Sequence, residues 1–150
     1  MIRISICLGT IALAAAASVA PAAAEHHAMV KAAADPDLEW GPCPDVFPGA
    51  CEIAVLQGNP AEPNADIFLR TGAGFEFPAH KHTSAERIIL VTGEMSLTYE
   101  GQETTTLSAG GYAYGPAGKP HVASCISDVP CTLFIAFEDP VDAELVDWAQ

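Results

Sequence analysis

The sequence predicts an all-β domain, either a sandwich or a barrel. Eight short segments are rich in Ile, Val, Thr, Phe and Tyr, and Gly, Pro, Asn or Asp residues separate them. Short strands divided by frequent turn signals are typical of these two architectures. The predicted strands are residues 67–71, 74–77, 88–92, 95–99, 104–107, 112–114, 121–125 and 132–137.

The first 24 residues are predicted to be a signal peptide. Arg3 provides a positive start, residues 4–17 are apolar, and residues 22–24 offer a small-residue cleavage site. A membrane-spanning helix is the alternative, but the apolar run is shorter than the about 20 residues that a span needs. We therefore expect an exported protein, periplasmic or secreted, with a flexible arm at residues 25–39 and the domain at residues 40–150.

The chain is long enough for one domain and is strongly acidic. Half of its 150 residues are hydrophobic, which is sufficient for a single core. It carries 19 acidic residues, against which only five basic residues remain once Arg3 is removed with the signal peptide. Such a surface repels phosphate backbones and anionic lipids, so we expect no nucleic-acid partner and no membrane partner after cleavage. The oligomeric state stays open, with a homodimer as one alternative.

Four cysteines remain after the predicted cleavage, which indicates two disulfides in an exported chain. Three connectivities are available, and local pairing is the most economical. Cys43 and Cys51 bracket a loop that contains Pro and Gly, whereas Cys125 and Cys131 flank the turn of a predicted hairpin. We expect the pairs Cys43–Cys51 and Cys125–Cys131, with free buried thiols as the alternative.

Residues 141–149 are the only segment predicted to be helical. The segment has an acidic first turn, and Leu145 and Trp148 are three residues apart. We expect this short helix to cover one end of the domain.

Three histidines and a glutamate form a predicted metal-ligand set: His80, His82, Glu86 and His121. In a strand, His80 and His82 point to the same face because side chains alternate. Imidazole is the commonest metal ligand among side chains, and a carboxylate adds charge and a hard oxygen. The set suits a divalent transition metal such as iron, manganese, nickel, copper or zinc, without selecting one. The alternative is a polar cluster without metal, which is costly to bury.

The residues around these ligands resemble the two sequence motifs of the cupin superfamily. The first motif is matched by Gly74, His80, His82, Glu86 and Gly93; the second is matched by Gly110, Pro116, Gly118 and His121. Cys125 stands where the family has Asn, at a position that is not a metal ligand in the family. The resemblance implies a single cupin domain, that is, a double-stranded β-helix or jelly-roll barrel.

Strand alternation also predicts the lining of the site. If Glu86 points inward, Ile88 and Leu90 do as well, and a hairpin partner strand after Gly93 presents Met95, Leu97 and Tyr99. These residues make a mostly apolar pocket, as expected for a small-molecule site, with plain barrel core as the alternative. Among the arginines only Arg70 has a chance of facing inward, which disfavours a strongly anionic substrate.

The resemblance implies several functions, because cupins with four ligands include dioxygenases, isomerases, decarboxylases and lyases as well as proteins that bind or sense. Our hypothesis is a metal-dependent, dioxygenase-type oxidoreductase that acts on a small, largely apolar oxygenated compound. Glu86 is the expected catalytic residue, and Tyr99, Tyr112 and Tyr114 are further candidates for acid or base. The alternative is a non-catalytic protein of the bacterial cell envelope that binds a metal or a small ligand.

Overall fold

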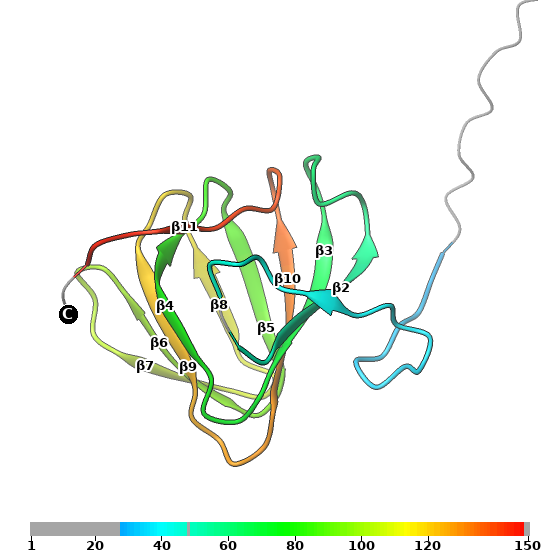
Figure 1. The fold of residues 1–150 in the computed structure, drawn as a ribbon, viewed down its shortest axis with the longest axis horizontal. Coiled ribbons are helices and arrows are strands. Elements are labelled where there is room, and N and C mark those ends of the chain that lie inside the picture. Colours follow the sequence, from blue (N-terminus) through cyan, green and yellow to red (C-terminus); the bar gives the residue numbers. More distant parts are fainter. Residues whose placement is uncertain (1–27, 48, 149–150) are drawn as a thin grey trace, which may run out of the picture. The chain divides into compact units, whose positions relative to one another are not determined.

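Two antiparallel sheets face each other in the computed structural model, which describes residues 28–47 and 49–148 (Figure 1). The six-stranded sheet contains, in spatial order, β1 (Gly41–Pro42), β2 (Cys51–Gln57), β3 (Asp66–Thr71), β10 (Cys131–Phe137), β5 (Glu86–Thr92) and β8 (Tyr112–Gly115). The five-stranded sheet contains β11 (Glu144–Leu145), β4 (Glu76–Lys81), β9 (His121–Cys125), β6 (Glu94–Tyr99) and β7 (Thr105–Ser108). The all-β prediction and its jelly-roll form are confirmed. The predicted signal peptide lies outside the described residues.

The hydrophobic core lies between the two sheets, because one face of each central strand is apolar. In β10, Cys131, Leu133, Ile135 and Phe137 are buried, and the residues between them are only partly buried. The same period of two appears in β5, β6 and β9. Because of this alternation, every second side chain of these strands points into the space between the sheets, where side chains from different strands can meet.

The predicted pairing of the strands on either side of Gly93 is wrong. β5 pairs with β10 and β8 in one sheet, whereas β6 pairs with β7 and β9 in the other. The chain changes sheet at Gly93, whose φ is +84° and where an added Cβ would lie 2.7 Å from Cys131 Sγ. Only glycine fits such a crossing. Because the sheets face each other, both strands still present their apolar faces to the interior.

Both predicted disulfides are confirmed, since Cys43 pairs with Cys51 and Cys125 pairs with Cys131. The hairpin expected around the second pair is wrong, because β9 and β10 belong to different sheets. Cys125 and Cys131 are 5.8 Å apart at Cα, so this disulfide joins the two sheets at one end of the core. Two disulfides are typical of proteins in an oxidising compartment.

Unreduced protein is expected to show no free thiol among these four cysteines in a mass-spectrometric alkylation assay. Replacing Cys125 and Cys131 by Ala should lower the free energy of unfolding by about 2 kcal/mol, because the short loop that they close is no longer restricted in the unfolded chain. Urea denaturation measures this change. Four alkylated cysteines in the untreated protein would contradict the pairing.

The predicted C-terminal helix is wrong. No residue between Val141 and Trp148 is helical; the segment is extended and contains β11, which pairs with β4. The backbone groups are satisfied from outside the segment, since Val141 N donates to Pro60 O and Val146 N donates to Ala79 O. These long-range hydrogen bonds stabilise the extended conformation more than a short helix would be stabilised by its two apolar residues. Across residues 28–47 and 49–148, the structure contains no helix suited by length and apolar character to crossing a membrane.

Candidate metal centre

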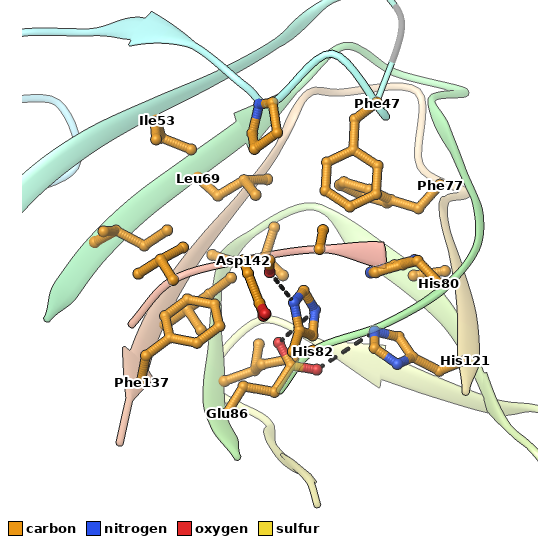
Figure 2. Close-up of a pocket in the computed structure, with 18 of the residues that line it drawn as sticks. Phe47, Ile53, Leu69, Phe77, His80, His82, Glu86, His121, Phe137 and Asp142 are labelled. Carbon is orange, nitrogen blue, oxygen red and sulfur yellow. Dashed lines mark hydrogen bonds and ion pairs between the residues drawn. The ribbon is translucent and has the colours of Figure 1, made fainter. Parts of the chain in front are cut away.

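Three strands bring the four predicted ligands together at one end of the core (Figure 2). His80 lies in β4 and His82 directly follows it, whereas Glu86 begins β5 and His121 begins β9. His80 and His121 are partners in the β4–β9 ladder. All four side chains are buried, with exposed fractions of 3–8%. The site therefore joins both sheets.

A β-bulge in β4 sets the direction of His80. Phe77 and His80 are both buried although they are three residues apart, which strict alternation would forbid. The register of β4 against β9 shifts between these residues, around Pro78. Bulges re-aim side chains in this way near functional sites.

The imidazoles are held in the tautomer that leaves Nε2 with a free lone pair. His80 Nδ1 donates to the carbonyl of Pro78 at 2.7 Å, and His121 Nδ1 donates to the carbonyl of Lys119 at 3.1 Å. His82 Nδ1 donates to the carbonyl of Asp142. Because each Nδ1 is occupied by an acceptor, each Nε2 is available to a metal ion.

The three histidines form a group that could hold a metal ion, because their ligand atoms all lie within 4.8 Å of one another. Glu86 adjoins this group without being part of it. Its Oε2 is 3.6 Å from His82 Nε2, and its Oε1 is 3.4 Å from His121 Nε2. Figure 2 shows the carboxylate pointing toward both rings.

The buried position changes the protonation of the site. Burial lowers the pKa of His80 from 6.5 to about 3, and it lowers the pKa of His121 to about 4; neighbouring histidines add to both effects. Burial raises the pKa of Glu86, although His82 opposes the change. Both imidazoles are therefore neutral at pH 7, as ligation requires.

The residues present fit a divalent cation. Glu86 Oε1 is buried without a hydrogen-bond partner, and His121 Nε2, which is an acceptor in this tautomer, lies 3.4 Å from it. Two acceptors this close are unfavourable to bury unless a cation or a proton lies between them. Three nitrogens beside a carboxylate match the preferences of a transition metal.

Gly115 and Tyr99 surround the carboxylate of Glu86. Gly115 is the register partner of Glu86 in the β5–β8 ladder, and a Cβ there would lie 2.6 Å from Glu86 Oε1 and 3.1 Å from Tyr99 Oη. The hydroxyl of Tyr99 is buried without a partner, and burial together with Glu86 raises its pKa. Sequence analysis missed Gly115, because its role depends on a partner strand that only the fold reveals.

Replacing Gly115 by Ala should displace the Glu86 side chain, because the new methyl group overlaps a buried carboxylate. We expect a loss of roughly 1–3 kcal/mol in the free energy of unfolding from overpacking. We also expect divalent metal binding to weaken about tenfold, as measured by competition with a chelator. Gly41→Ala is the control, since nothing lies within 4 Å of its added Cβ. Equal behaviour of the two variants would contradict the role of Gly115.

A mostly apolar cavity of about 70 Å³ adjoins the histidines. Of the five predicted lining residues, Ile88, Met95 and Leu97 line it, whereas Leu90 and Tyr99 are buried in the core and are not part of its wall. Sequence analysis missed several wall residues, which include Phe47, Phe77, Phe137 and Asp142. Phe47 comes from the loop closed by Cys43 and Cys51, and its ring centroid is 4.7 Å from that of His80. No local sequence signal places such a loop residue inside the barrel.

Three other candidates lie outside the cavity. Tyr112 and Tyr114 are 57% and 48% exposed, so they do not serve as acids or bases at this site. Arg70 binds Glu52 at 2.7 Å and lies over the ring of Trp40. Among the described residues that line the cavity there is no lysine or arginine.

Comparison with known proteins supports the same fold. Residues 68–137 match a family model described as "Cupin domain". None of the curated proteins searched matches the chain. Solved structures that resemble it include the DMSP lyase DddQ from Ruegeria pomeroyi, with a TM-score of 0.61, 21% identity, and coverage of 72% of this chain and 60% of the lyase. This chain therefore spans less than two thirds of the length of that enzyme.

Two further structures of similar size also match. An RmlC-like cupin from Shewanella frigidimarina has a TM-score of 0.58 and 21% identity, and the match covers 70% of this chain and 86% of that protein. A predicted oxalate decarboxylase from Thermotoga maritima has a TM-score of 0.60 and 16% identity, with coverage of 69% and 94%. At these identities the likeness concerns the fold alone.

Proposed function

The chain belongs to the cupin superfamily, and from this premise we propose that it is a metal-dependent oxygenase acting on a small, largely apolar oxygenated compound. His80, His82 and His121 bind one divalent transition-metal ion through their Nε2 atoms, and Glu86 is the fourth ligand. The observation that carries this proposal is the convergence of three buried imidazoles whose Nδ1 atoms all donate to backbone carbonyls. A bound ion supplies Lewis-acid activation of an enol or phenol oxygen.

In this proposal Glu86 shifts between metal ligand and general base. Its Oε1 is buried and has no hydrogen-bond partner, so it is free to accept the hydroxyl proton of an enol or phenol. Burial raises the pKa of this carboxyl when no cation adjoins it, so the carboxylate would be a stronger base once it leaves the ion. Tyr99 adjoins the carboxylate, and its ring centroid is 5.2 Å from that of His121.

The walls of the cavity support a neutral substrate. Phe77, Phe137, Ile88 and Leu97 supply apolar contacts, and the described lining contains no cationic side chain that would neutralise a dicarboxylate such as oxalate. A cavity of about 70 Å³ also limits the substrate to a small molecule. These features favour a small neutral compound such as an enol, a diketone or a phenol, and the proposal adds dioxygen as co-substrate.

The two disulfides support a further part of the proposal, which is that the protein is exported. In this interpretation residues 1–24 are removed as a signal peptide and residues 40–150 act as the cupin domain in the periplasm or outside the cell. Amino-terminal sequencing of the protein purified from its native compartment tests the cleavage site.

Oxygen consumption tests the reaction. Metal-free protein is loaded in turn with iron(II), manganese(II), nickel(II) or copper(II) and mixed with a panel of phenols and diketones. We expect uptake of dioxygen with at least one ion, and a loss of at least tenfold in Glu86→Gln if the carboxylate is the base. Arg70→Gln is the matched control, because Arg70 lies outside the cavity.

A second candidate function is a metal-binding or ligand-binding protein without catalysis. One observation favours it: apart from the three histidines, the ionisable groups among the described lining residues are Glu86 and Asp142, and Asp142 is already bonded to Thr83. If phenols or diketones bind to the metal-loaded protein yet none of the four ions supports oxygen uptake, this binding function replaces the oxygenase.

A further inference from the structure

The segment that follows β10, residues 138–146, crosses from one sheet to the other; we call it the C-terminal strap. Figure 1 shows it in red, running from the end of β10 to the edge of β4. Its strand β11 pairs Glu144 with Lys81 and Leu145 with His80. Val141, Asp142 and Ala143 form part of the cavity wall. The strap therefore lies directly against the strand that carries His80 and leads into His82.

Asp142 accepts hydrogen bonds from two consecutive residues, His82 and Thr83. Its carbonyl accepts a hydrogen bond from His82 Nδ1. Its carboxylate accepts two more, from Thr83 N at 2.9 Å and from Thr83 Oγ1 at 2.6 Å. Figure 2 shows Asp142 beside the ring of His82.

This arrangement differs from the support of the other two histidines. His80 and His121 each donate to a carbonyl two residues earlier in their own segment, at Pro78 and Lys119. His82 lies beyond the end of β4, and its acceptor is 60 residues away in sequence. Its main-chain carbonyl is fixed by Gly118 N, but the direction of its ring depends on the strap.

We propose that Asp142 is a positioning residue that orients His82 toward the metal, a role that rests on the proposed metal binding. The carboxylate fixes the strap to Thr83, and this attachment places the Asp142 carbonyl opposite His82 Nδ1. Acceptors of this kind set the tautomer and ring direction of a ligating histidine, and their loss commonly weakens metal binding by about 10–100-fold.

The rest of the strap remains attached when the Asp142 carboxylate is removed. Val141 N donates to Pro60 O at 2.8 Å, Val146 N donates to Ala79 O at 3.0 Å, and Lys81 pairs with Glu144 at 3.2 Å. Asp142→Ala should therefore loosen the His82 contact in a chain that stays folded, which circular dichroism and thermal melting verify.

Cobalt(II) is the probe, because its visible absorption reports ligand geometry independently of activity. We expect Asp142→Ala to raise the cobalt(II) Kd about 10–100-fold and to change the absorption spectrum, and Asp142→Asn to restore part of both because its amide oxygen still accepts from Thr83 N. Glu144→Gln is the matched control, since it removes a partly exposed ion pair of the same strap.

The outcomes separate this inference from the proposed function. If wild-type protein binds cobalt(II) and Asp142→Ala leaves both Kd and spectrum unchanged, Asp142 has no positioning role. Equal losses in Asp142→Ala and Glu144→Gln also overturn it, because they would reflect general attachment of the strap. If the wild-type protein binds no cobalt(II), the metal site and the positioning role fail together.

Discussion

The His80→Ala, His82→Ala double variant is expected to bind no divalent metal ion, whereas the wild-type chain binds about one. The double change removes two of the three neutral nitrogens that converge at the site. One imidazole and one carboxylate then remain, which falls short of the three protein ligands that metal centres with an open position usually have. Elemental analysis of protein dialysed after loading with zinc(II) or manganese(II) measures the loss.

The matched control for this experiment is Lys81→Ala, which lies between the two histidines in sequence. Lys81 pairs with Glu144 at the surface and is not among the cavity-lining residues. The control should keep its metal. The double variant should remain folded, because the core between the sheets is supplied by apolar residues such as Leu90, Leu133 and Ile135. A folded double variant with full occupancy would refute the assignment of the site.

Acidification is expected to destabilise the metal-free protein. The pKa of His80 is about 3 and that of His121 about 4 in the folded state, against 6.5 for an unperturbed histidine. The unfolded chain therefore takes up two protons below pH 6.5 that the folded chain does not accept until about pH 3–4. Stability contributed by these groups is present at pH 7 and is lost as pH falls toward 4, by on the order of 6 kcal/mol.

Glu86 opposes this loss. Because its pKa is raised in the folded state, the folded chain binds this proton at a higher pH than the unfolded chain does, and folding gains stability on acidification above pH 4.5. The net fall should therefore be smaller than the histidines alone would cause, and Glu86→Gln should steepen it. Urea denaturation between pH 7 and 4.5, with a chelator present, measures both slopes. A flat stability profile in the wild-type and Glu86→Gln proteins would contradict the burial of neutral imidazoles.

The sequence was sufficient to predict the features that depend on local pattern. Alternation of apolar residues identified the strands and showed that Ile88, Leu90, Met95, Leu97 and Tyr99 are inward-facing. The need for glycine at the motif positions is also a local property of the backbone. All four of them adopt positive φ values that other residues rarely accept: Gly74, Gly93, Gly110 and Gly118. Cysteines close in sequence could be paired because short loops bring them within reach.

Features that depend on which strands meet could not be predicted. The hairpins expected around Gly93 and between Cys125 and Cys131 do not form, because a chain that leaves a strand may either fold back in the same sheet or cross to the other, and both routes use similar turn residues. The inward-facing residues were nevertheless identified, since opposed sheets share one interior. For the same reason Gly115 gained its role only once β8 was seen to lie beside Glu86.

By itself the sequence determined the all-β class and the identity and spacing of the candidate metal ligands, because these follow from side-chain chemistry and a period of two. Only the tertiary structure decided that the C-terminal segment is a strap and that Phe47 and Asp142 reach the site. The physical reason is that β4 would be an edge strand with unpaired backbone groups if β11 did not pair with it. A segment with a weak helical preference satisfies more of its own backbone groups by pairing there. Contacts such as that of His82 with Asp142 join residues 60 positions apart in sequence, so a local sequence pattern cannot predict them.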